Sequence, residues 1–66
     1  MVVKYEFADY YGKTKSKGYF LSSSKAKIMA QRKANSTGKT MYVDKVKFLG
    51  GFPQSSRRIG KLKPRK

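Results

Sequence analysis

The chain has 66 residues, of which 17 are Lys or Arg and three are Asp or Glu, giving a formal net charge of +14. It contains no cysteine and no histidine, which excludes disulfides, thiolate metal sites and the most common general base. A chain of this length forms one small domain with a thin margin of stability.

Two features predict where the protein is located. No apolar run approaches the roughly 20 residues needed to span a bilayer, and the N-terminus lacks the apolar core of a secretory signal. We therefore expect a cytoplasmic protein that does not insert into membranes, and association with the nucleoid or the ribosome would fit its charge.

The N-terminal third predicts a β-hairpin. Residues 2–11 alternate in the manner of a strand, with valine, tyrosine and phenylalanine at the odd positions 3, 5 and 7 on one face. Residues 12–18 form a polar run bounded by glycines, as in a long hairpin loop. Residues 19–21 (Tyr-Phe-Leu) are then expected to return as a second, antiparallel strand.

Residues 22–38 carry both a start and a stop signal for a helix. Ser22 and the serines after it can cap the first turn, and Gly38 can adopt the left-handed conformation that ends the last one. Ile28 projects to the side away from the predicted core and is expected to be exposed. The core-facing stripe, at helical spacing, consists of Ala26, Met29, Ala30 and Ala34.

The next strand begins at residue 39, with Met41 and Val43 facing inward. After Asp44-Lys45 the apolar residues change parity, which turns every side chain to the other face. Two interpretations fit this change: a tight turn into a fourth strand, or a bulge within one bent strand. We favour the bent strand because Asp-Lys lacks the glycine of the preferred two-residue turns.

Residues 50–53 (Gly-Gly-Phe-Pro) are expected to end the sheet. Residues 54–66 contain six basic and no acidic side chains, so they are predicted to stay flexible until they meet a partner. The predicted fold is therefore α+β: an antiparallel sheet of three strands, or four with the turn, packed on one helix in the order β-β-α-β. The domain spans residues 1–53 and the basic tail spans residues 54–66.

The basic residues predict the main function. Phosphate is the most common dense anion in a cell, and each neutralised phosphate of a nucleic acid releases counterions. Lysines outnumber arginines by 13 to 4, which favours backbone contact over reading of base edges. The candidate nucleic-acid-binding residues come from the loop, the helix and the tail: Lys13, Lys15, Lys17, Lys25, Lys27, Arg32, Arg57, Arg58, Lys61, Lys63, Arg65 and Lys66.

Four aromatic residues occupy positions that can lie on the open face of the sheet. Rings exposed beside lysines are typical of sites that stack the bases of single strands, although in a small protein the same rings can belong to the core. The candidates for stacking are Tyr10, Tyr11, Phe20 and Tyr42.

Catalysis is not expected. The only acidic residues are Glu6, Asp9 and Asp44, and Glu6 and Asp9 have opposite parities in the first strand. They are too few for a metal site, so no metal, cofactor or small-molecule substrate is predicted.

The sequence thus predicts a non-catalytic protein that binds DNA or structured RNA through the phosphate backbone with low sequence specificity. A ribosome-associated protein is an alternative. Another is a small basic effector or adaptor, for instance phage-encoded, that binds an acidic host protein. A continuous basic groove would favour nucleic acid, whereas an apolar patch rimmed by lysines would favour a protein partner.

Overall fold

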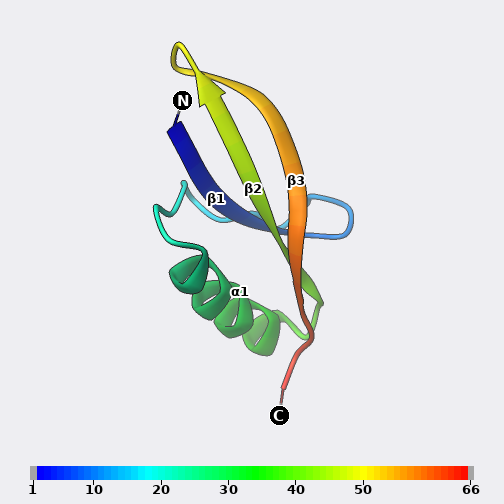
Figure 1. The fold of residues 1–66 in the computed structure, drawn as a ribbon. Helices are drawn as coiled ribbons and strands as arrows, with labels where there is room; N and C mark the ends of the chain where they lie inside the picture. The colour runs from blue at the N-terminus through cyan, green and yellow to red at the C-terminus, as the bar shows by residue number, and fades with distance from the viewer. Residues whose placement is uncertain (1, 66) are drawn as a thin grey trace.

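The computed structural model describes residues 2–65, which form three strands and one helix in the order β-α-β-β. The strands make a single antiparallel sheet with the spatial order β1-β2-β3, and α1 packs against one end of it (Figure 1). The small α+β class is confirmed, while the predicted order β-β-α-β is wrong. The elements are β1 (Val2–Asp9), α1 (Ser23–Thr37), β2 (Met41–Leu49) and β3 (Phe52–Leu62).

The predicted second strand is replaced by an irregular segment along the free edge of β1, residues 14–20, which we call the edge segment. It runs antiparallel to β1, as the hairpin predicts, but pairs only at the bridges Ala8–Lys15 and Tyr5–Phe20. Three steps along β1 correspond to five along the segment, so a regular ladder cannot form. The two additional residues of the segment are accommodated in an irregular turn around Ser16, whose hydroxyl donates to the Gly18 carbonyl at 2.8 Å.

The helix has the boundaries that its end signals predict. The Ser22 hydroxyl accepts a hydrogen bond of 3.4 Å from the Lys25 amide. Gly38 has a φ of 72°, and its amide donates to the Ala34 carbonyl at 2.8 Å. Ile28 is exposed, and the predicted inward stripe is confirmed by the buried Ala26, Ala30 and Ala34 and the half-buried Met29.

The core lies between this stripe and the helix-facing side of the sheet. Phe7, Met41 and Val43 are buried against the three alanines. Because alanine is small, the helix backbone can approach the sheet closely. The half-buried side chains around the core are Tyr5, Phe20, Met29 and Leu62.

The change of parity after Asp44 takes place within one continuous strand, so the preferred interpretation of a single strand is confirmed over the turn, while the bulge predicted within it is wrong. The pairing of β1 with β2 is uninterrupted, and Val46, which is 3% exposed, lies on the face opposite Val43. The register shifts occur between β2 and β3, where Val43 pairs with Gly60 but Asp44 pairs with Arg58. At the second shift Lys47 pairs with Ser55 but Phe48 pairs with Pro53, so β3 carries one extra residue at each shift, Ile59 and Gln54.

The flexible tail predicted from residue 54 is wrong for residues 54–62, which belong to β3 and pair with β2. The boundary predicted between residues 53 and 54 falls inside this strand. Beyond β3 the chain follows the helix, where the Gln31 amide donates to the Lys63 carbonyl at 2.7 Å and the Arg65 amide donates to Asn35 Oδ1 at 2.6 Å. Backbone pairing compensates for the few apolar side chains that this segment offers.

Candidate nucleic-acid interface

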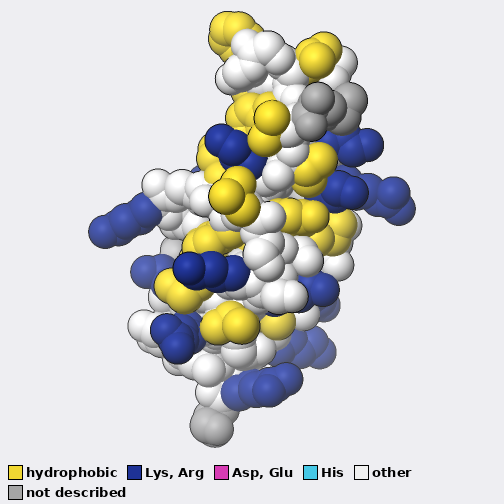
Figure 2. All heavy atoms as spheres, turned by 60° about the vertical axis from the view of Figure 1, so that its left-hand side comes forward, with side chains coloured by type: hydrophobic (Ala, Val, Ile, Leu, Met, Phe, Trp, Pro, Cys, Tyr) yellow, Lys and Arg dark blue, Asp and Glu magenta, His cyan; other side chains and the backbone are white. Residues whose placement is uncertain are grey.

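The structure distributes the predicted basic residues over several surfaces. Lys15 and Lys17 of the edge segment line one groove together with Arg32 and Lys33 of α1. Lys13 instead lies with Lys39 at a second hollow, among tyrosines. Figure 2 shows Lys and Arg side chains around separate apolar patches on one face of the molecule.

The remaining basic candidates lie outside both hollows. Lys25 is exposed on the first turn of α1, and Lys27 lies beside Gly60, where a Cβ added to the glycine would be 3.4 Å from the lysine Cε. The strand β3 contains Arg57, Arg58 and Lys61. The segment after it contains Lys63 and Arg65. Lys66 lies outside the described residues.

Three of the four predicted stacking residues form a tyrosine cluster, which we define as Tyr10, Tyr11 and Tyr42. The ring centres of Tyr10 and Tyr11 are 5.1 Å apart in an edge-to-face arrangement, and those of Tyr10 and Tyr42 are 6.2 Å apart. Tyr10 is 64% exposed and Tyr11 is 82% exposed. The cluster and the lysines Lys13 and Lys39 line a hollow of about 550 Å³.

Arg58 extends the cluster onto β3. Its guanidinium carbon lies 4.0 Å from the centre of the Tyr42 ring, within the range of a cation–π contact. Its Nε is also 3.9 Å from Asp44 Oδ1, at the outer limit of an ion pair, and both side chains are partly exposed, so this pair contributes little. Lys61 pairs with Tyr42 across the two strands, which adds a second cation from β3.

Asp9 shapes the turn that carries the tyrosine cluster. Its side chain is buried, and its Oδ1 accepts a hydrogen bond of 2.8 Å from the Lys13 amide. Its own amide donates to the Thr14 carbonyl at 2.9 Å, and its carbonyl accepts from Gly12, which has a φ of 73°. Asp9 is therefore engaged in holding Tyr10, Tyr11 and Lys13 on one side of the turn.

The other acids lie together in the sheet. Glu6 pairs with Asp44 across β1 and β2, and Asp44 pairs in turn with Arg58.

Residues 2–65 contain no group of three potential metal-binding side chains from His, Cys, Asp and Glu. Within the same residues, no helix combines the length and the apolar character needed to cross a membrane.

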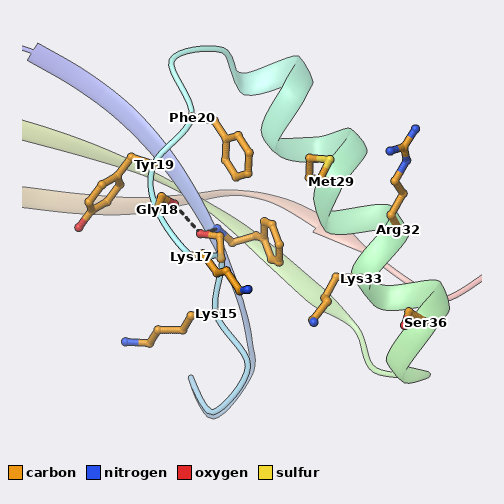
Figure 3. A pocket seen from close by; sticks show the side chains of 11 residues that line it. Lys15, Lys17, Gly18, Tyr19, Phe20, Met29, Arg32, Lys33 and Ser36 are labelled. Carbon is orange, nitrogen blue, oxygen red and sulfur yellow. Dashed lines mark hydrogen bonds between the residues drawn. The ribbon is translucent and has the colours of Figure 1, made fainter.

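The fourth stacking candidate, Phe20, lies on the helix side of the sheet and not in the tyrosine cluster. Its ring stacks on Phe7, with ring centres 6.0 Å apart and an interplanar angle of 16°. Both rings line a groove between the edge segment and α1 (Figure 3). The alternative that some of the aromatic candidates belong to the core therefore applies to Phe20, which is half-buried against it.

A second aromatic contact lies on the opposite face and was missed by sequence reasoning. Tyr19 meets Phe48 edge-to-face at 5.1 Å, and the Lys4 ammonium lies 5.3 Å from the centre of the Phe48 ring. The alternation of the side chains could have predicted this contact. Tyr19 lies on the face opposite that of its neighbour Phe20, and Phe48 lies on the same face as Val46.

No protein-family model, curated protein or solved structure matches this chain.

Proposed function

We propose that this protein binds nucleic acid without catalysing a reaction, with lysines and arginines on the phosphates and unpaired bases on the tyrosine cluster. The observation that carries the proposal is the position of two strongly exposed tyrosine rings, Tyr10 and Tyr11, in the same hollow as Lys13 and Lys39. Aromatic faces beside cations are the combination that single strands use for binding.

The tyrosine rings supply the part of the affinity that does not depend on salt. Every base has a π-face, so stacking tolerates any sequence and contributes roughly 1–3 kcal/mol per base. Tyr42 is half-buried and contacts both Tyr10 and Arg58, so it packs against the Tyr10 ring, which in turn contacts Tyr11. Tyr10 and Tyr11 are therefore the rings assigned to the bases.

The cations supply the salt-dependent part. Lys13 and Lys39 border the hollow, while Arg58 and Lys61 extend the positive charge along β3 beside Tyr42. Lysine acts on phosphate as a point charge without the bidentate geometry of arginine, so the predominance of lysine supports low sequence specificity. The net charge of +14 would also accelerate the encounter with a polyanion.

The proposal is tested by salt titrations of the full-length chain with a short DNA duplex, a DNA single strand of equal length and an RNA hairpin. We expect micromolar or tighter binding at physiological salt, and an affinity that falls steeply as salt increases. The single strand and the hairpin should bind more tightly than the duplex, because only unpaired bases can stack on Tyr10 and Tyr11.

Two results would count against the proposal. Loss of all binding at physiological salt would exclude nucleic acid as the functional partner. Equal affinities for the three probes would exclude the role of the tyrosine cluster and leave binding driven by charge alone.

A further inference from the structure

The groove between the edge segment and α1, which we call the segment–helix groove, combines an apolar floor with a basic rim. It has a volume of about 650 Å³, and its floor is formed by Phe7, Phe20 and Met29. Figure 3 shows the Phe20 and Met29 side chains pointing toward one another from the two walls. The volume falls within the range of pockets that bind small ligands, so it has room for an apolar side chain together with part of the backbone that carries it.

Two cations face each other across this floor. Lys17 of the edge segment and Lys33 of α1 point into the space between the walls, while Lys15 and Arg32 also line the groove but project away from this space (Figure 3). The single ion pair among residues 2–65 joins Arg58 and Asp44, so the described structure pairs none of these four cations with a carboxylate. An occupant with negative charge would relieve their mutual repulsion.

We propose that the segment–helix groove docks an acidic peptide segment of a partner protein, in which an aromatic or aliphatic side chain is flanked by Asp or Glu. The apolar side chain would fill the floor over Phe20 and Met29, and the carboxylates would reach Lys17 and Lys33. This docking goes beyond the proposed binding of nucleic acid, since it uses different residues on a different surface.

The polar groups of the groove favour a peptide side chain over a nucleotide base. A base carries donors as well as acceptors on its edge, and the cations of the groove can only donate. Of the two serine hydroxyls that line the groove, those of Ser16 and Ser36, the first is already engaged: Ser16 Oγ donates to the Gly18 carbonyl at 2.8 Å and accepts from the Phe7 amide at 3.3 Å. A buried base edge without partners would lose affinity, whereas a phenyl or isobutyl group loses nothing.

Methionine methyl NMR gives a direct readout, because Met29 lines the groove and Met41 is buried in the core. Protein labelled with [¹³C-methyl]methionine would be titrated with a synthetic peptide, Ser-Glu-Asp-Glu-Phe-Asp-Glu-Leu-Gly-Ser. A second peptide with serine in place of phenylalanine and leucine has the same charge. We expect a saturable shift of the Met29 signal with the first peptide only, and little change at Met41.

Two matched double variants separate this groove from the tyrosine cluster, since each lowers the net charge by two. Lys17→Gln/Lys33→Gln should weaken the peptide about tenfold and change the affinity for a short oligothymidylate by about twofold or less. Arg58→Gln/Lys61→Gln should do the reverse. Met29→Gln should also weaken the peptide, while Ile28→Gln, outside the groove on the same helix, should not. Circular dichroism melts would confirm that each variant is folded.

Four results would overturn the docking proposal: no saturable shift of the Met29 signal, equal binding of the serine-substituted peptide, equal weakening by both double variants, or displacement of the peptide by oligothymidylate from the groove. The last would make nucleic acid the occupant. Failure of the proposed function is distinguishable, because it would abolish oligonucleotide binding and leave the Met29 titration intact.

Discussion

The side-chain amide of Gln31 in α1 donates a hydrogen bond of 2.7 Å to the backbone carbonyl of Lys63, just beyond β3. Gln31 also bonds Asn35 Oδ1 at 2.9 Å, and the same oxygen accepts from the Arg65 amide. The side of α1 that faces away from the segment–helix groove therefore holds the C-terminal segment, and this segment is part of the folded domain.

A chain that ends at Pro53 should lose its cooperative thermal transition. It lacks nearly all of β3, so β2 becomes an edge strand and Leu62 no longer covers the core beside Met41. This loss exceeds the roughly 5 kcal/mol margin of a small domain. A chain that ends at Leu62 keeps the whole β2–β3 ladder and should keep its transition by circular dichroism. Similar melting midpoints for the two chains would show that β3 is dispensable.

Asp9→Ala should destabilise the protein by about 1–3 kcal/mol, because it leaves the Lys13 amide without its buried acceptor. Urea unfolding would measure the loss, and hydrogen exchange at the Lys13 amide should become faster. Asp9→Asn retains an acceptor oxygen and should cost less. Glu6→Ala is the control: it also removes one negative charge, but Glu6 lies opposite another carboxylate, Asp44, so its loss should not destabilise the protein. An equal loss of stability in the two alanine variants would refute the role of Asp9 in holding the turn.

Ala30→Leu should destabilise by about 1–3 kcal/mol through overpacking. Ala30 is fully buried where α1 faces the sheet, so added methylenes would push the helix away. Ile28→Leu, on the exposed side of the same helix, should change stability by less than about 0.5 kcal/mol. Thermal and urea unfolding of both variants would test whether α1 lies close against the sheet at Ala30. An unchanged unfolding midpoint for Ala30→Leu would show that the interface between the helix and the sheet can accommodate the larger side chain.

Replacing Tyr10 and Tyr11 by leucine should weaken single-strand binding by roughly 1–3 kcal/mol for each base that no longer stacks. The slope of log affinity against log salt should stay constant, because no cation is removed. Tyr19→Leu changes a ring that packs on Phe48 instead and serves as the control. If the control weakens binding as much as the double variant, the tyrosine cluster is not the stacking site.

Arg58→Gln/Lys61→Gln should reduce the magnitude of the salt slope by about 1.4 to 1.8, which corresponds to two phosphate contacts on single- or double-stranded nucleic acid. Salt titrations of oligonucleotide binding give this slope directly. Lys25→Gln/Lys45→Gln removes the same charge away from the tyrosine cluster and should leave the slope nearly unchanged. Equal slopes for the two double variants would indicate that phosphates contact the whole surface without preference.

The helix was predictable because its signals are local. Ser22, Gly38 and the alanines at every fourth position act within one or two turns, so the sequence alone determined where α1 begins, where it ends and which side it buries. The continuous β2 was predictable for a similar reason, since the alternation of its side chains and the absence of a turn glycine lie within a few residues of Asp44.

The strand β3 could be decided only by tertiary structure. Its pattern of side chains is polar and basic, and the free energy that orders it comes largely from backbone hydrogen bonds to β2, which leave no trace in residue type. The same holds for the candidate sites. Tyr10, Tyr42 and Arg58 come from three segments that are distant in the sequence, and they meet because the strands pair in this register. Phe20 reaches the core because the edge segment returns along β1 to Tyr5, using two residues more than β1 does over the same length. The sequence by itself determined the charge and the local elements, whereas long-range pairing determined which charges and rings share a surface.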